Sequence, residues 1–302
     1  MNLVNLHQLY ERFVDVKFFR IRFGEKKPLL CINDPDIRKL IDNERTSFFS
    51  SHKIISAYVI FGKTDEVELF TSHDISEIRD FVKRIKVGEE KTGIIEQIYE
   101  NEPKFVHYTF AEYFATEFLC DRLKLFQSET SLWTYFINTF LKSEKGGPRR
   151  FFNAKLGNQP LMLNEIHSAP VNEFFENLLT EHLKLAKLIF MAIDEYLENS
   201  AMFLLKCLKT VLNKNNLDDF IDVVTKKYNK SCIVCIATER NAKNVVTFII
   251  NHIKDIDVER LIDLYKCSDL PKYNSVTVAY GFVDGYLWSS RLGDPPPNLQ
   301  ML

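Results

Sequence analysis

Phe105-Val-His-Tyr-Thr-Phe-Ala-Glu-Tyr-Phe-Ala-Thr-Glu-Phe-Leu-Cys120 is the stretch that decides the predicted fold, because a strand ends and a helix begins within it. Thr109 stands three residues before Glu112, which is the spacing of a capping box. In that motif the threonine hydroxyl accepts a backbone N–H of the first turn, and the carboxylate reaches back to the cap. Tyr108 and Tyr113 have the spacing of a hydrophobic staple. The sequence therefore predicts a helix capped at Thr109.

The same stretch carries an apolar stripe. Phe110, Phe114 and Phe118 recur at every fourth position, so one face of the predicted helix is expected to be buried. Residues 105–107, just before the cap, are interpreted as a short buried strand that ends in His107.

A hairpin is predicted upstream of this helix. Residues 93–99 are apolar, and the polar segment 100–104, which contains a proline, separates them from the strand at 105–107. Two such runs around a turn of about five residues are typical of a β-hairpin.

Further elements precede the hairpin. Periodic or apolar segments mark residues 1–18, 36–43, 50–59 and 74–86. The first and last are predicted helices, and the middle two are short helices or a helix and a strand. Gly88 is expected to end the helix at 74–86. Helices, a hairpin and then a capped helix predict a winged-helix-like unit over residues 1–127.

The second half of the chain predicts a helical array. Residues 128–170 are interpreted as a helical linker, which Gly146-Gly147-Pro148 interrupts. Residues 171–290 contain a series of short apolar segments separated by polar turns, at 178–197, 202–212, 217–224, 231–237, 245–253 and 258–265. Helix pairs in series are typical of an α-solenoid, either a degenerate ankyrin-like array or another type, although no strict period is readable. Residues 291–302, with three consecutive prolines, predict a disordered tail. The predicted fold class is mainly α.

The composition indicates a well-packed helical protein. The 302 residues include 25 Phe but only ten Gly and ten Pro, so helix breakers are few and bulky apolar side chains are many. The net charge of −2 gives no bulk electrostatic attraction to nucleic acid or to an anionic membrane. The candidate recognition helix, residues 110–123, is acidic, which would repel phosphates. Apolar runs are too short to span a membrane, and the N-terminus shows no signal pattern, so we expect a cytoplasmic protein.

Six cysteines are scattered along the chain. Cys232 and Cys235 form a C-x-x-C within an apolar run, and we interpret them as reduced core thiols. A metal site and a redox dithiol are the alternatives. The first needs a second ligand pair, which is not evident, and the second needs an exposed electropositive helix start.

No local motif assembles a catalytic or metal site. Gly62-Lys63-Thr64 is interpreted as a turn, because the bulky residues before it cannot form a phosphate loop. The carboxylates of Glu89, Glu90, Glu100 and Glu102 lie in predicted turns and are interpreted as solvated. Seven histidines occur singly, and His107 is interpreted as a core histidine that is hydrogen-bonded to backbone.

Phe105-Val-His107-Tyr-Thr109-Phe110-Ala-Glu112-Tyr113-Phe114-Ala115 resembles the stretch that follows the ATPase core in NACHT-type STAND NTPases, at their winged-helix arm. Residues 5–13 and 91–95 are similar to segments before this motif in arthropod NACHT proteins that end in ankyrin repeats. The resemblance covers residues 1–125. It implies an arm without the ATPase core, because the family's Walker A loop and Walker B strand lie upstream of this motif and are not present here.

The resemblance also bears on single residues. It places His107 where family members have a nucleotide-sensing arm histidine, so His107 is the one candidate for cofactor binding, although no cofactor is expected. Residues 231–252 resemble one ankyrin repeat, with Ser231 and Ala237 at matching positions and Cys232 and Val234 departing from the pattern.

Two classes of function follow. The leading hypothesis is a non-enzymatic interaction or signalling scaffold, in which the arm and the helical array bind a protein partner. The alternative is a nucleotide-responsive regulator or an enzyme whose site is assembled from distant residues, such as His107 with a nearby carboxylate.

Overall fold

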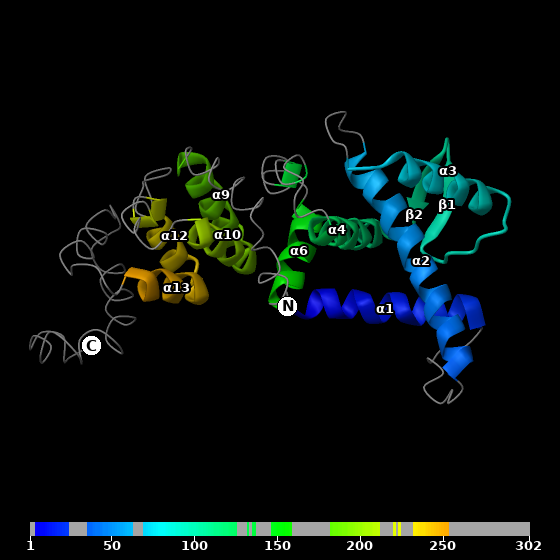
Figure 1. Ribbon diagram of the computed structural model, residues 1–302, viewed down its shortest axis with the longest axis horizontal. Helices are drawn as coiled ribbons and strands as arrows, with labels where there is room; N and C mark the ends of the chain where they lie inside the picture. Colours follow the sequence, from blue (N-terminus) through cyan, green and yellow to red (C-terminus); the bar gives the residue numbers. More distant parts are fainter. Residues whose placement is uncertain are drawn as a thin grey trace, which may run out of the picture. The chain divides into compact units, whose positions relative to one another are not determined.

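The computed structural model describes residues 4–23, 35–62, 69–125, 132, 135–136, 146–158, 182–211, 220–221, 223–224 and 232–253. This part of the chain is mainly helical and contains a two-stranded antiparallel sheet, as predicted (Figure 1). The elements are α1 (Val4–Phe23), α2 (Pro35–Phe61), α3 (Ser72–Lys86), β1 (Ile95–Tyr99), β2 (Glu102–Phe105), α4 (Tyr108–Leu125), α6 (Gly146–Asn158), α9 (His182–Asp194), α10 (Glu198–Val211), α12 (Ile233–Glu239) and α13 (Lys243–Ile253). The chain divides into two compact units, Met1–Phe174 and Phe175–Leu302. The predicted tail at 291–302 lies outside the described residues.

The long helix α2 lies at the centre of the first unit, where it packs against α3 and α4. The sequence predicted two short elements over this segment, at 36–43 and 50–59, and that prediction is wrong. Residues 44–49 contain neither Gly nor Pro, so nothing in them stops the helix. Phe48 from this join is buried in the core.

The end of α3 follows the predicted pattern. Gly88 has a φ of 79°, a left-handed conformation that glycine adopts without strain. The N–H of Gly88 donates to the carbonyl of Ile85, and the N–H of Glu89 donates to that of Arg84. These two bonds form a Schellman motif, which ends the helix and satisfies its last carbonyls.

The hairpin is tighter than predicted. β1 and β2 pair antiparallel, with Ile98 opposite Pro103 and Tyr99 opposite Glu102. Only Glu100 and Asn101 form the turn, and both have positive φ, 47° and 70°. Positive φ at both central residues is the two-residue hairpin turn that matches the twist of the strands. The second strand therefore lies earlier in the chain than the predicted 105–107, and the hairpin contacts α2, α3 and α4.

Aromatic rings fill the core of the first unit. Phe110, Phe114 and Phe118 of α4 are all buried. Tyr10 of α1 contacts the rings of Phe110, Tyr113 and Phe151, with centroids 5.0 to 5.9 Å apart. Through these contacts α6, which lies in the segment predicted as a linker, packs against α1 and α4.

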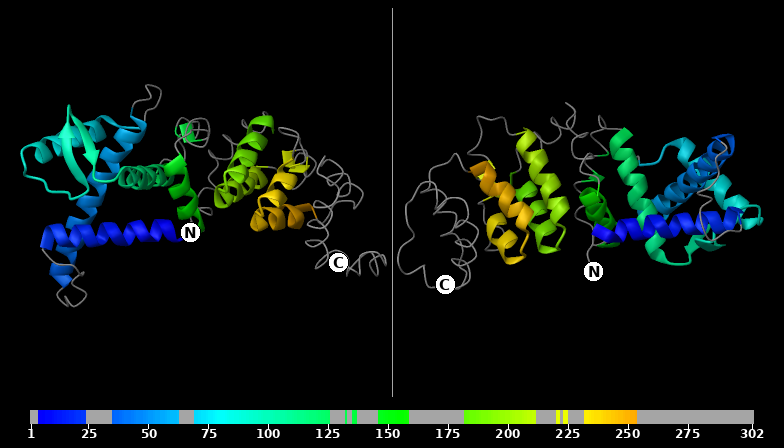
Figure 2. Two further views of the ribbon diagram at one scale, coloured as in Figure 1. Left: turned by 180° about the vertical axis from the view of Figure 1, so that it is seen from behind. Right: turned by 90° about the horizontal axis from the view of Figure 1, so that it is seen from below.

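The described part of the second unit consists mostly of two helix hairpins, α9–α10 and α12–α13 (Figure 2). In each hairpin only three residues connect the helices, so the two helices are antiparallel neighbours. The first helices of the two hairpins, α9 and α12, pack together, and so do the second helices, α10 and α13. Among the described residues, no helix is both long and apolar enough to cross a membrane.

Candidate functional site

The N-terminus of α4 differs from the predicted capping box. The helix begins at Tyr108, and the carbonyl of His107 accepts the N–H of Phe110 at 3.0 Å. Thr109 therefore lies inside the first turn, and its hydroxyl accepts a hydrogen bond from Tyr10 Oη at 2.7 Å. His107 lies in an exposed bend after β2, not in a buried strand. Its ring contacts the ring of Phe110, with centroids 6.4 Å apart.

Glu112, the other half of the predicted box, faces α6. A Cβ added to Gly147 would lie only 2.1 Å from the Glu112 carboxyl group, so the absence of a side chain at Gly147 makes room for Glu112. The carboxyl group is thus near the positive end of the α6 dipole, where negative charge is favoured. Burial raises the pKa of Glu112, and the charge of Arg150 opposes this rise. One turn further on, Thr116 donates to the carbonyl of Pro148 at 3.1 Å.

A capping box does form at α3. The Thr71 hydroxyl accepts the Asp74 N–H at 3.1 Å, and the Asp74 carboxylate accepts the Thr71 N–H at 2.6 Å and the Thr71 hydroxyl at 2.7 Å. Asp74 is only 4% exposed. The same carboxylate pairs with Arg122 of α4, so the cap also ties α3 to α4.

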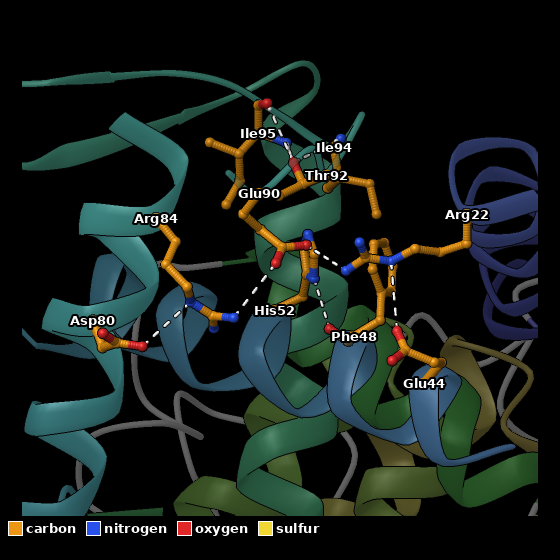
Figure 3. A network of polar contacts seen from close by, with 10 residues as sticks. All are labelled: Arg22, Glu44, Phe48, His52, Asp80, Arg84, Glu90, Thr92, Ile94 and Ile95. Carbon is orange, nitrogen blue, oxygen red and sulfur yellow. Dashed lines mark hydrogen bonds and ion pairs between the residues drawn. The ribbon is translucent and has the colours of Figure 1, made fainter. Parts of the chain in front are cut away.

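A polar network surrounds Glu90, which follows the end of α3 (Figure 3). Its side chain is 9% exposed and lies between two guanidinium groups, those of Arg22 from α1 and Arg84 from α3. Arg84 also pairs with Asp80 at 3.2 Å, and Arg22 lies 3.9 Å from Glu44. The prediction that Glu90 is a solvated turn residue is wrong, because the turn folds inward to place its carboxylate between these arginines.

Among the described residues of the first unit, His52 is a buried histidine bonded to backbone, a description that the sequence analysis gave to His107. His52 is completely buried, and its Nδ1 lies 2.7 Å from the carbonyl oxygen of Phe48. Burial lowers the pKa of His52 to about 4, so the ring is neutral at physiological pH. Its Nε2 has no hydrogen-bond partner among the described residues, and neither does Ser56 Oγ one turn further along α2.

A hollow of about 620 Å³ lies between the β-hairpin and the C-terminal end of α2. Its polar lining comes from exposed side chains of the hairpin, Gln97, Glu102 and Lys104. His107 does not line it. The sequence suggested a site in which His107 lies close to a carboxylate. This hollow therefore does not contain that site. Within the described ranges, no three His, Cys, Asp or Glu side chains come together as metal ligands would.

In the second unit, the two helix connections share one backbone geometry. Tyr196 has a φ of 60° and Asn241 a φ of 54°, in the left-handed region. The Tyr196 N–H donates to Ile193 and the next N–H donates to Ala192; the Asn241 N–H donates to Thr238 and the next N–H donates to Ala237. Each connection is therefore a Schellman motif with a non-glycine residue in the left-handed position.

Side chains join the two connections. Arg240 donates to Asp194 Oδ1 and to Tyr196 Oη, the latter at 3.2 Å, and its guanidinium carbon lies 5.3 Å from the centre of the Tyr196 ring. Glu198 at the start of α10 accepts the backbone N–H of Asn244 in the first turn of α13, at 2.7 Å. We call these stacked turns the connection surface, which consists of Asp194, Tyr196, Glu198, Arg240, Asn241 and Asn244.

Cys232 and Cys235 stand at the N-terminus of α12. Cys232 is the N-cap residue, and its sulfur accepts the Cys235 N–H at 3.4 Å. The two sulfurs are 3.0 Å apart and both residues are buried, at 1% and 8% exposure. The hydrogen bond to Cys235 and burial both raise the pKa of the Cys232 thiol.

Sequence reasoning missed the connection surface, although a signal was present. When the chain is compared with itself at an offset of 45 positions (241 − 196), Ala192 meets Ala237, Asn199 meets Asn244 and Phe203 meets Phe248. Apolar residues match elsewhere in the two hairpins, which share a pattern of burial.

The comparisons with known proteins give no further guide. A scan against models of protein families, a search of curated proteins and a search of solved structures each find no match to this chain.

Proposed function

We propose that this chain is a non-enzymatic protein-interaction module, in which a winged-helix-like arm is followed by an array of repeated helix hairpins. The observation that carries the proposal is the equivalence of the two connections. Tyr196 and Asn241 adopt the same left-handed conformation and the same pair of backbone hydrogen bonds. The same local structure at two places in one chain, with like residues around it, is the mark of a repeat.

The packing of the two hairpins supports the array. Equivalent helices contact one another, α9 with α12 and α10 with α13, so each hairpin buries an apolar face against the next. This is how repeat proteins obtain a continuous core from units that are too small to fold alone. The offset exceeds the roughly 33 residues of ankyrin repeats and lies within the range of about 40–47 residues found for other helical repeats. Residues 231–252 therefore resemble an ankyrin repeat within one hairpin, whereas the spacing between the two hairpins is not that of ankyrin repeats.

The connection surface is the place where we expect a partner to bind. Tyrosine and arginine are enriched at protein interfaces, where they contribute much of the binding energy. Tyr196 is 61% exposed, and the cation of Arg240 lies beside its ring. Because salt bridges and backbone bonds already order this surface, a partner would bind it with little further loss of conformational entropy.

The first unit supports a structural role as well. The order α3, β1, β2, α4 supports this proposal, because a helix, a hairpin and a helix in succession is the order expected of a winged-helix-like arm. Two arginines of this unit, Arg22 and Arg84, are both paired with Glu90. A carboxylate of the chain itself therefore already pairs with both of these guanidinium groups, as a phosphate would.

The experiment is site-specific photocrosslinking in the full-length protein, with the reactive amino acid at position 196 or 241. We expect both positions to capture the same protein, which should then bind the purified chain directly. The control is Leu40 of α2, which is 64% exposed and lies in the first unit. Capture of the same protein at equal yield from position 40 would contradict the proposal.

A matched variant sharpens the test. Tyr196→Asn gives the first connection the residue that the second connection has at the equivalent position. Asn tolerates the left-handed conformation, so the helix end should persist. Removal of a central aromatic anchor should weaken binding by about tenfold or more. Leu40→Ser should leave the affinity unchanged. Equal affinities for the two variants, or measurable turnover on a nucleotide substrate, would argue against this function.

A further inference from the structure

The strongest unexplained feature is the pair of sulfurs at the N-terminus of α12. Cys232 and Cys235 are one helical turn apart, and their sulfurs approach to 3.0 Å in a buried position. The equivalent positions in the first hairpin are Lys187 and Phe190, so the fold of the hairpin does not itself require two thiols there. Cys207 and Cys120 are also buried.

The backbone geometry already suits a bond between these sulfurs. Residues three apart on a helical turn have α carbons about 5 Å apart, from the rise and radius of the helix. A disulfide requires α carbons about 4.4–6.8 Å apart. The first turn of α12 therefore has room for a disulfide without a large movement of the backbone.

We propose that Cys232 and Cys235 form a thiol-modification site, a dithiol that a low-molecular-weight disulfide such as oxidised glutathione converts into an intramolecular disulfide. The inference rests on the side-chain geometry of α12 and is independent of the proposed function.

The reaction proceeds in two exchange steps. The thiolate of Cys235 attacks one sulfur of oxidised glutathione, the disulfide bond of the oxidant breaks, and one glutathione thiolate leaves. The thiolate of Cys232 then attacks the Cys235 sulfur, the mixed disulfide breaks, and the second glutathione leaves. The two cysteine protons pass to the two departing thiolates. The protein dithiol has lost two electrons and two protons, and the oxidant has been reduced to two molecules of glutathione.

The two cysteines have different roles in this sequence. Cys235 is the more exposed of the two, at 8% against 1%, so it reacts first with a molecule from solution. Cys232 is the resolving residue, because its sulfur lies next to that of Cys235 and attack within one turn is favoured by proximity. The hydrogen bond to Cys235 and burial raise the pKa of Cys232, which disfavours Cys232 as the first nucleophile. Oxidation waits for a local opening of the seven-residue helix α12 and is therefore slow.

The test uses the full-length reduced protein, incubated under native conditions with excess oxidised glutathione. After quenching in acid, unreacted thiols are alkylated in denaturant and the protein is mapped by peptide mass spectrometry. We expect two fewer alkylated thiols, loss of two hydrogens, and a bond between Cys232 and Cys235 that dithiothreitol reverses. A native chain that retains both thiols, or in which the bond forms only after denaturant is added, would overturn the proposal.

Two variants separate the roles. Cys232→Ser keeps a favoured N-cap residue, so α12 should still form. This variant lacks the resolving thiol, and we expect glutathione to remain attached to Cys235. Cys207→Ser removes another buried thiol of the same unit and should form the disulfide like the wild type. A disulfide lost in Cys207→Ser, or a Cys232→Ser variant that carries no glutathione, would also overturn the assignment.

Discussion

The helices α3 and α4 begin with the same pattern, a threonine followed three residues later by a carboxylate, and the structure uses the two patterns differently. At α3, Thr71 and Asp74 bond to each other's backbone N–H groups. At α4, Thr109 bonds to Tyr10 and Glu112 lies against Gly147. The comparison teaches that a capping box is one choice among several for these side chains, and that tertiary partners can displace it.

The difference has a geometric cause. At α3 the aspartate is short and buried, and Arg122 holds its carboxylate close to the cap. At α4 the chain enters the helix directly from β2, and helical geometry already begins at Tyr108. Thr109 is then no longer at the N-cap, and the longer glutamate reaches the start of α6.

The largest expected effect comes from Asp74→Ala. This change removes the buried carboxylate that accepts two bonds from Thr71 and pairs with Arg122. We expect the free energy of unfolding to fall by about 3 kcal/mol, the lower end for a broken buried ion pair. Urea unfolding measures this loss. The matched change Glu112→Ala should lower the free energy of unfolding by about 1 kcal/mol or less. Equal losses would erase the distinction between the two helix starts.

The second prediction concerns Gly147. In the wild type, Gly147→Ala places a Cβ at 2.1 Å from the Glu112 carboxyl group, so the glutamate must move. We expect a loss of about 1 kcal/mol from this crowding. In the Glu112→Ala background the same change should instead stabilise the fold by about 0.5–1 kcal/mol, because alanine favours the helix more than glycine does. A double-mutant cycle measures the change of sign, and an effect independent of residue 112 would refute the contact.

The third prediction compares the two threonines. Thr71→Ala removes the N-cap acceptor of α3 and should cost about 1 kcal/mol. Thr109→Ala removes only an exposed bond to Tyr10 and should cost less than about 0.5 kcal/mol. Thermal or urea unfolding of both variants provides the measurement. If Thr109→Ala cost as much as Thr71→Ala, Thr109 would be acting as a cap after all.

The smallest effect is a dependence on pH. Burial raises the pKa of Glu112, so the folded chain holds a proton there at a higher pH than the unfolded chain does. The stability contributed by this group is present below the unfolded pKa and is lost as pH rises through the folded pKa. Glu112→Gln, which stays neutral, should therefore stabilise the fold at pH 7 by less than about 1 kcal/mol, since the side chain is half-buried.

The control for this last prediction is the acid limb of the same titration. Unfolding of wild type and Glu112→Gln should converge as pH falls below about 4, where glutamate is itself neutral in both states. A constant difference between Glu112→Gln and wild type at every pH would show that charge is not the cause.

Much of the secondary structure could be predicted because its signals are local. Gly88 ends α3 as expected, since the required left-handed φ depends on a single residue. The hairpin was predicted, but the predicted turn was too long. Glu100 and Asn101 both adopt left-handed conformations, and their residue types do not predict this pair of conformations. The sequence analysis did not predict α2 as one continuous helix, because a polar segment within a helix looks like a break between two shorter elements.

The polar centres were harder to predict. Nothing near Glu90 in the sequence marks it as buried, since its partners Arg22 and Arg84 come from other elements. His107 follows Val106 and precedes Tyr108, whereas His52 lies between Ser51 and Lys53, and yet packing makes His52 buried and His107 exposed. The two helix hairpins were recognised as helical but not as equivalent, because few identical residues link them.

By itself, the sequence determined a mainly helical chain, a short antiparallel hairpin and the buried phenylalanine stripe of α4, because these depend on spacing along the chain. The tertiary structure alone decided which threonine became a cap, which histidine became buried, where Glu90 found its arginines, and that two connections adopt one geometry. The reason is physical: a side chain has several partners of similar energy within reach, and the packing of distant elements selects among them.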